Sequence, residues 1–198
     1  MGKNSLIYSN VFVYRLSMSL LYKGLYRRRF GEICKLLSGV KVTELCFGDI
    51  IIANYCKIHK IEWNGVDINE TFVEFARKRG YNAEMNDINN LNYFSKADTC
   101  VLSGSLYHFK DNIENLFNKL LDCAPRIIIS EPVINLSTRN GIIGKMARAA
   151  ANVNGQKQNF RFTKETLLET LSNLSARLNF KFQIIAQVDK DLIVLITR

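Results

Sequence analysis

The sequence predicts an α/β protein with one mostly parallel, seven-stranded sheet that ends in an antiparallel hairpin. Three observations support this fold class. Short apolar runs alternate with segments of helical periodicity from residue 40 onward. The first run leads into a glycine-containing turn within Lys41-Val-Thr-Glu-Leu-Cys-Phe-Gly-Asp-Ile50. The last two runs flank a short polar turn at residues 189–191, which is typical of a hairpin.

Residues 1–39 precede the sheet and predict a helical cap. Two helical faces carry the apolar side chains Val11, Tyr14, Met18, Leu21 and Leu25, then Phe30, Ile33, Cys34 and Leu37. Basic residues interrupt these faces, so no run reaches the roughly 18 apolar residues of a membrane span. The segment also lacks a convincing secretory signal, which would combine a basic start, an apolar stretch and a small-residue cleavage site. We therefore expect two helices packed over a ligand cleft and no transmembrane segment.

The first half of the sheet follows as strand, turn, helix and strand. Helical spacing after the turn involves Ile51, Ile52, Tyr55 and Ile58, and residues 63–67 form the next short strand. Asn69 is placed to cap a second helix, which ends at Gly80. A third strand is expected at residues 82–85. Residues 40–132 thus form the expected cofactor-binding half.

The second half begins with a fourth strand at residues 98–104, which leads into Ser105-Leu-Tyr-His-Phe109. Asp111, supported by Glu114, is expected to cap the next helix. The fifth strand, at residues 126–132, is apolar without alternation and is therefore expected to be buried on both faces. Residues 163–198 then predict a helix capped by Thr163 and two strands at 181–188 and 192–197.

Residues 133–162 differ from the rest because small, polar and basic residues alternate with weak periodicity. We expect at most a short helix near residues 141–151. Thirty such residues inside a compact domain usually form a functional insertion. We interpret this segment as a lid over an acceptor site.

A nucleoside ligand is indicated by the turn together with the acid that ends the next strand. Asp67 lies 19 positions after Gly48, and a carboxylate there can bind both hydroxyls of a ribose. A pyrophosphate clamp needs G-x-G-x-x-G, whereas this turn retains Gly48 alone. A dinucleotide is therefore not expected.

The turn resembles motif I of class I S-adenosylmethionine-dependent methyltransferases, in which an acid precedes a short glycine-bearing turn. The resemblance covers about residues 40–198 and implies a Rossmann-like fold with S-adenosylmethionine as cofactor. Two positions depart from the motif, since Cys46 and Ile50 replace its first and last glycines. The cofactor-binding residues that the resemblance implies are Glu44, Cys46, Gly48 and Asp49 for the methionyl end, Asp67 and Ile68 for the ribose, Asp87 and Ile88 for the adenine, and Ser103 and Gly104.

Methyl transfer by displacement requires nucleophile, methyl and sulfur in line, and a base only if the acceptor must lose a proton. His108 and Glu131 are titratable groups expected at strand ends, and they are the candidate catalytic residues. Tyr107 and Arg161 are the candidate substrate contacts. The structural alternatives are that His108 closes a turn, that Glu131 orients backbone and that Tyr107 is a packing residue.

Composition agrees with a single cytoplasmic domain. The chain has 198 residues and 47% hydrophobic residues, which suffices for one core. Its five cysteines include no C-x-x-C pair and it has two histidines, so reduced thiols and no metal site are expected.

The net charge of +9 is dispersed, with triplets at residues 27–29 and 77–79 and further basic residues across 133–162. The triplets are interpreted as solvated helix ends.

A small-molecule acceptor, with an acidic group as one option, is favoured over nucleic acid. The alternatives are a non-catalytic S-adenosylmethionine-binding protein of the same fold and an RNA or anionic-lipid methyltransferase. The acceptor, its nucleophilic atom and the oligomeric state stay undetermined.

Overall fold

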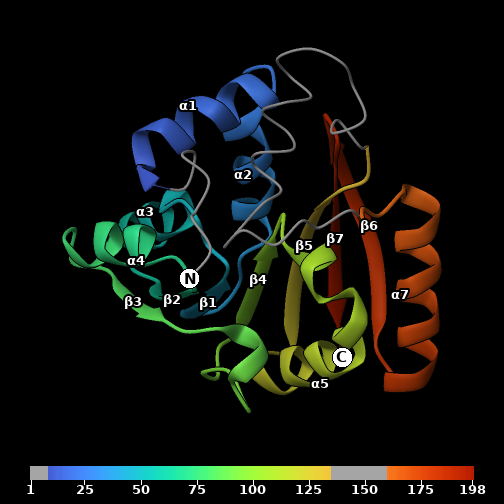
Figure 1. Ribbon diagram of the computed structural model, residues 1–198. Coiled ribbons are helices and arrows are strands. Elements are labelled where there is room, and N and C mark those ends of the chain that lie inside the picture. Colours follow the sequence, from blue (N-terminus) through green and yellow to red (C-terminus); the bar gives the residue numbers. More distant parts are fainter. Residues whose placement is uncertain (1–8, 135–159) are drawn as a thin grey trace.

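The computed structural model describes residues 9–134 and 160–198, which contain a seven-stranded sheet in the order β3-β2-β1-β4-β5-β7-β6 (Figure 1). Its strands are β1 (Lys41–Leu45), β2 (Glu62–Asp67), β3 (Asn82–Met85), β4 (Thr99–Ser103), β5 (Arg126–Pro132), β6 (Lys181–Val188) and β7 (Asp191–Thr197). Strands β1 to β5 pair in parallel, whereas β7 runs antiparallel to both β5 and β6. The fold class expected from the sequence is confirmed.

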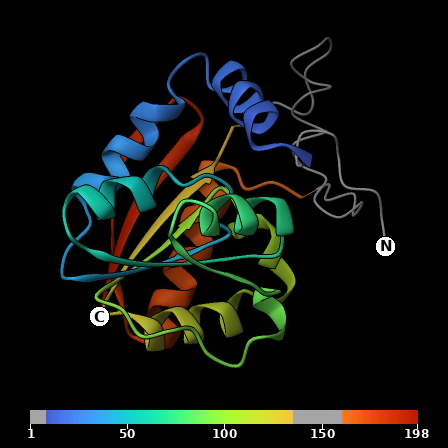
Figure 2. The same cartoon turned by 90° about the vertical axis from the view of Figure 1, so that its left-hand side faces the viewer.

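Helices cover both faces of this sheet, as the side view shows (Figure 2). They are α1 (Val11–Leu21), α2 (Tyr26–Lys35), α3 (Ile51–Ile58), α4 (Glu70–Arg77), α5 (Ile113–Cys123) and α7 (Lys164–Leu178), with 3-10 helices η2 (Ile88–Asn90) and η3 (Leu106–Asn112). Helices α5 and α7 share one apolar cluster with the sheet, and α1 to α4 share the other. Among the described residues, no helix is long and apolar enough to cross a bilayer.

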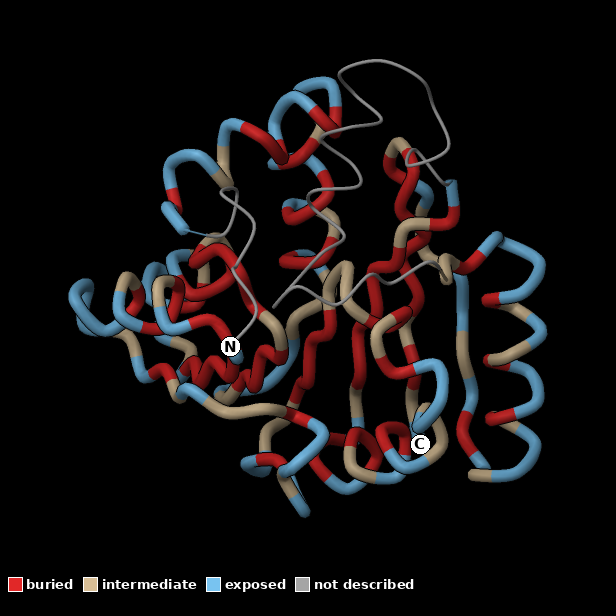
Figure 3. Tube along the Cα trace, viewed as in Figure 1, coloured by how far each residue is buried: buried red, intermediate tan, exposed pale blue. Residues whose placement is uncertain are grey.

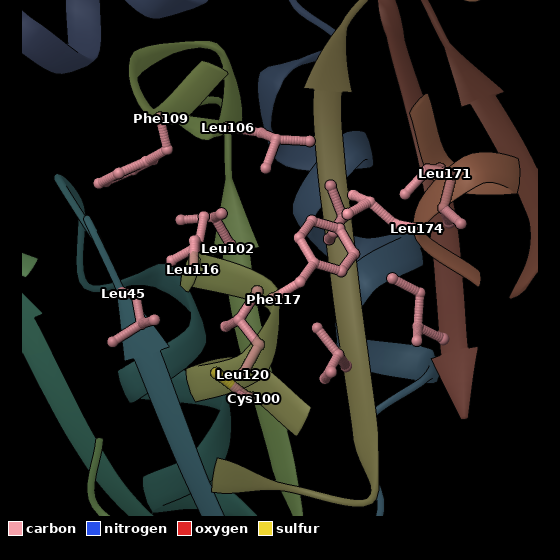
Figure 4. Packing of buried hydrophobic residues seen from close by; sticks show 14 of the residues in the cluster. Leu45, Cys100, Leu102, Leu106, Phe109, Leu116, Phe117, Leu120, Leu171 and Leu174 are labelled. Carbon is pink, nitrogen blue, oxygen red and sulfur yellow. The ribbon is translucent and has the colours of Figure 1, made fainter. Parts of the chain in front are cut away.

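The central strands are buried on both faces, which explains why their sequences lack alternation. In β5, Ile127 and Ile129 belong to the cluster under α5 and α7, while Ile128 belongs to the cluster under α1 to α4. Phe117 of α5 lies within the first cluster (Figure 4). Its ring stacks on Phe180, with centroids 5.6 Å apart. Burial of one such side chain stabilises the fold by about 1.5–3 kcal/mol.

Two of the three expected helix caps form. The Asn69 side chain accepts from the Thr71 N–H at 2.9 Å, and Thr163 makes a reciprocal capping box with Thr166. The expected cap at Asp111 is wrong. Because Leu106, Tyr107 and Phe109 are all buried, the chain continues as the 3-10 helix η3 through Asp111, and α5 begins at Ile113 without a side-chain cap.

Most of the expected lid, residues 135–159 with the short helix near 141–151, lies outside the described residues. Its described ends pack against the fold. Val133 and Phe162 are buried, and the Phe160 and Phe162 rings meet edge to face at 4.9 Å.

A buried ion pair joins the helical cap to the carboxy-terminal hairpin. Arg29 Nη1 of α2 lies 2.9 Å from Asp191 Oδ2 at the start of β7, and these side chains are 5% and 0% exposed. The Tyr22 hydroxyl donates to Asp191 Oδ1 at 2.9 Å, and Ser130 Oγ donates to Oδ2 at 3.1 Å. The expectation that residues 27–29 are all solvated is therefore wrong for Arg29, because its side chain is buried in the ion pair with Asp191.

We expect Asp191→Ala to lower the free energy of unfolding by about 3–5 kcal/mol, because Arg29 would remain buried without its counter-charge. Urea denaturation followed by circular dichroism measures this loss. The control is Glu62→Ala, which breaks a 2.9 Å pair with Lys41 whose side chains are 62% and 37% exposed. That loss should stay under about 1 kcal/mol. Equal, small losses in the two variants would contradict a structural role for the buried pair.

Candidate functional site

The turn after β1 is shaped by two residues in the left-handed region. Cys46 has φ 53° and Gly48 has φ 56°. Glycine adopts this conformation freely, whereas a residue with a Cβ pays about 1–2 kcal/mol. The Cys46 N–H donates to the Val66 carbonyl at 2.7 Å, which holds the turn against the end of β2. Glycine in place of Cys46 would therefore relieve strain.

Asp67, at the end of β2, is bonded directly to this turn. Its Oδ2 accepts from the Gly48 N–H at 3.0 Å, and Oδ1 accepts from the Asn69 N–H at 2.8 Å. Burial raises the pKa of Asp67 to about 6, although the neighbouring N–H donors oppose the shift. The carboxyl is therefore mostly ionised at pH 7. Two of the expected cofactor residues, Gly48 and Asp67, thus form one hydrogen-bonded unit.

Asp49 is buried and bound by the cap. Arg15 Nε of α1 lies 3.0 Å from both carboxylate oxygens, and Arg15 Nη2 lies 2.6 Å from Oδ1. Tyr14 of the same helix covers the turn, since a Cβ on Gly48 would lie 2.9 Å from the Tyr14 hydroxyl. Sequence reasoning missed Arg15. The available signal was a lone charge within an otherwise apolar helix.

The other two acids of the expected cofactor-binding set, Glu44 and Asp87, lie in different environments. Glu44 is fully buried and accepts from Trp63 Nε1 at 2.8 Å, and burial raises its pKa well above the usual value. Asp87 is partly exposed and caps η2 by accepting from the Asn89 N–H at 2.9 Å. Its neighbour Ile88 is buried, whereas Ile68 is 40% exposed. Glu44 is therefore directed into the core, while Asp87 lies just beyond the carboxyl end of β3.

The end of β4 is open to close approach. Gly104 has φ 70°, and among the described residues a Cβ there would meet Arg29 Nη1 alone, at an ordinary 3.6 Å. The Gly104 N–H donates to the Ser130 carbonyl at 2.6 Å, and Arg29 Nη2 donates to Ser103 Oγ. The ion pair between cap and hairpin thus reaches the expected cofactor residues Ser103 and Gly104. Sequence reasoning did not connect Arg29 with this site.

Glu131 supports the segment that follows β4. Its two carboxylate oxygens accept from the Leu106 and Tyr107 N–H groups at 2.9 and 3.3 Å, and the side chain is fully buried. Burial, and then the Asp191 charge, raise the pKa of Glu131 to about 8. The sequence suggested catalysis or backbone orientation for this residue. In the structure its carboxyl group orients the η3 backbone.

Tyr107, His108 and Arg161, which the sequence placed near an acceptor, come together. The Tyr107 and His108 rings lie 3.9 Å apart, and the Arg161 guanidinium lies 3.7 Å from the Tyr107 ring centroid. Burial and the charge of Arg161 lower the pKa of His108 to about 4. His108 is therefore neutral at pH 7.

No protein-family model matches this sequence, and a search of curated proteins also finds no match. Solved structures do resemble the fold. One is the plantazolicin methyltransferase BpumL in complex with a desmethylPZN analog and S-adenosylhomocysteine. It is 14% identical to this chain with a TM-score of 0.65, and the alignment covers 91% of this chain and 85% of BpumL. The methyltransferase domain of bacterial CtHen1 is 16% identical with a TM-score of 0.67, covering 87% and 98%. A possible histamine N-methyltransferase from Thermotoga maritima is 16% identical with a TM-score of 0.64, covering 96% and 97%.

The chain has the class I S-adenosylmethionine-dependent methyltransferase fold. S-adenosylmethionine is the cofactor of this fold, as neighbours in complex with it or with S-adenosylhomocysteine indicate. The β1 turn, Asp67 and the end of β4 therefore occupy the edge at which open parallel sheets bind their ligands.

We expect Gly48→Ala to lower the free energy of unfolding by about 1–2 kcal/mol, because a Cβ is strained at positive φ and would meet the Tyr14 hydroxyl. Thermal unfolding by calorimetry measures the change. Gly31→Ala is the control, since Gly31 lies inside α2 with nothing within 4 Å of a new Cβ. That variant should gain up to about 1 kcal/mol. A neutral Gly48→Ala would show that the turn tolerates a side chain.

Proposed function

We propose that the protein is an S-adenosylmethionine-dependent methyltransferase acting on a small-molecule acceptor. The observation that carries this proposal is the hydrogen bond from the Gly48 N–H to Asp67, which joins the β1 turn to the acid ending β2. This unit stands at the carboxyl edge of a sheet in a fold that resembles those of solved methyltransferases. Composition alone would not distinguish such a protein from other α/β enzymes.

The residues present fit the cofactor. An ionised carboxylate offers about four lone-pair sites, and the backbone N–H groups of Gly48, Ile68 and Asn69 use part of that capacity at Asp67. Asp67 therefore retains acceptor capacity for a ribose hydroxyl. Asp87 and Ile88 would adjoin the adenine. The turn from Cys46 to Asp49 would adjoin the methionyl end of the cofactor. Gly104 would adjoin it too, because a glycine has no side chain to block the approach of a ligand.

The acceptor site is proposed around Tyr107, His108 and Arg161. The bound cofactor supplies a methyl group on a sulfonium, whose carbon–sulfur bond breaks as the bond to the acceptor forms. Arg161 places positive charge beside Tyr107, which favours an acceptor with an acidic or polar group. His108 is neutral at pH 7 and is the candidate to take a proton that the acceptor loses, although its lowered pKa makes it a weak base. Glu131 acts as a positioning residue through the backbone of η3.

We expect Asp67→Asn to weaken S-adenosylmethionine binding at least about tenfold, because charge-assisted bonds to the ribose are lost. Isothermal titration calorimetry gives the dissociation constant. Since the pKa of Asp67 lies near 6 and binding favours the ionised form, wild-type affinity should fall about tenfold per pH unit below 6. The Asp67→Asn variant should lack this pH dependence, because its amide does not titrate.

The control for this substitution is Asp122→Asn, which changes an exposed carboxylate of α5 and should leave affinity unchanged. Wild-type affinity retained by a folded Asp67→Asn protein would remove the ribose assignment alone. Failure of the wild-type protein to bind the cofactor would reject the proposed function. Binding without transfer to any acceptor in a radiolabelled-methyl screen would identify a non-catalytic protein of this fold.

We expect His108→Asn to lower kcat by about 10² to 10⁴ while cofactor affinity changes only a few fold, if the histidine accepts the proton. Titration of His108 should not change the wild-type rate between pH 8 and pH 5, because its pKa is lowered to about 4 and the side chain stays neutral over that range. His59→Asn, which changes the other, exposed histidine, is the control. Retention of most of the turnover by folded His108→Asn would assign catalysis to placement instead.

A further inference from the structure

Helix α1 carries an exposed apolar stripe on the side that faces away from the sheet. Phe12 is 75% exposed, Leu16 55% and Leu20 58%, at a spacing of four residues, and Val13 beside them is 41% exposed. The opposite side of the helix is buried through Val11, Met18 and Leu21. Figure 3 shows this division along the helix. Among the other described α-helices, α3 exposes one large hydrophobic side chain, Ile58, and α2, α4, α5 and α7 expose none, so a row of such side chains occurs on α1 alone.

The segment of sequence that contains the stripe is rich in positive charge. Residues 1–31 contain six Lys or Arg and no Asp or Glu, in a chain whose net charge is +9. Two of these cations are used inside the fold, since Arg15 pairs with Asp49 and Arg29 pairs with Asp191. The next exposed cations after Leu20 are Lys23, Arg27 and Arg28. None of these three takes part in an ion pair with a described residue.

We propose that α1 docks the protein onto an anionic lipid surface. Phe12, Leu16 and Leu20 would enter the boundary between headgroups and acyl chains, and Lys23, Arg27 and Arg28 would contact the headgroups. An apolar helix face accompanied by basic residues and free of acids is the combination that binds such surfaces. A second copy of this chain is disfavoured, because its contact would bring two segments of the same positive charge together.

The docking face is fixed to the rest of the protein. The Arg15–Asp49 ion pair and the Tyr14 ring, 4.9 Å from Phe72 of α4, hold the inner side of α1. The stripe can therefore bind while the helix stays packed. Helix α1 also lies over the same edge of the sheet as the candidate site (Figure 1). Docking would hold that site close to the lipid surface.

Co-sedimentation with large unilamellar vesicles tests the proposal on the full chain. We expect binding to vesicles of phosphatidylcholine mixed with phosphatidylglycerol and little binding to phosphatidylcholine alone. Raising the salt concentration should weaken the binding. In a Phe12→Trp variant, tryptophan emission should shift to shorter wavelength when the mixed vesicles are added, because the only other tryptophan, Trp63, is buried.

Substitutions separate the apolar from the basic contribution. Leu16→Ser should weaken partitioning at least about tenfold, since burial of a few methyl and methylene groups is lost. Arg27→Gln with Arg28→Gln should weaken it about 25-fold, at about fivefold for each cation. The matched controls lie elsewhere: Ile184→Ser on β6, and Lys164→Gln with Lys181→Gln, each at exposed positions, should bind as the wild type does.

Absence of wild-type binding to mixed vesicles, or equal binding by the Leu16 and control variants, would overturn the proposal. So would an unshifted emission spectrum in Phe12→Trp. Sedimentation equilibrium that shows a dimer lost in Leu16→Ser, without vesicle binding, would assign the stripe to a second copy instead. None of these readouts requires methyl transfer, so failure here is distinguishable from failure of the proposed function.

Discussion

The buried pair between Arg29 and Asp191 is the interaction on which the arrangement of the candidate site depends. Two charges removed from water are tolerable only when each satisfies the other and further hydrogen bonds complete the set. Tyr22 and Ser130 supply such bonds to Asp191, and Ser103 accepts one from Arg29. The cap, the hairpin and the ends of β4 and β5 therefore converge on one polar cluster. An otherwise separable helical segment becomes part of the ligand-binding edge.

The acids around this edge show how environment assigns different roles to similar groups. Asp49 is held by the Arg15 side chain and anchors α1, whereas Asp67 accepts from backbone N–H groups, among them those of Gly48 and Asn69. Glu131 uses both oxygens to fix η3. Burial raises the pKa of both Asp67 and Glu131, since the charged form loses hydration in each case. Of these three acids, Asp67 is the one that we propose as the ribose ligand.

Some features of the site were predictable because their causes are local. Gly48 follows an apolar strand and Asp67 ends the next one, and parallel strands bring their carboxyl ends to one edge. The same reasoning placed Tyr107 and His108 after β4. The cap at Asp111 was mispredicted, because burial of the three apolar residues of η3 outweighed the local capping preference. The lowered pKa of His108 depends on burial and on Arg161, which lies far away in sequence.

The sequence by itself determined the fold class, the turn, the antiparallel hairpin and the identity of the acids at the strand ends. Periodicity and turn chemistry act over a few residues, so they can be read along the chain. Only the tertiary structure decided which charges are buried. Arg29 and Asp191 are 162 positions apart. Each lies in a polar stretch of sequence, the basic triplet at 27–29 and the turn at 189–191, which by itself predicts exposure to solvent. Desolvation and its compensation are properties of neighbours in space, and these neighbours exist only after the sheet has formed.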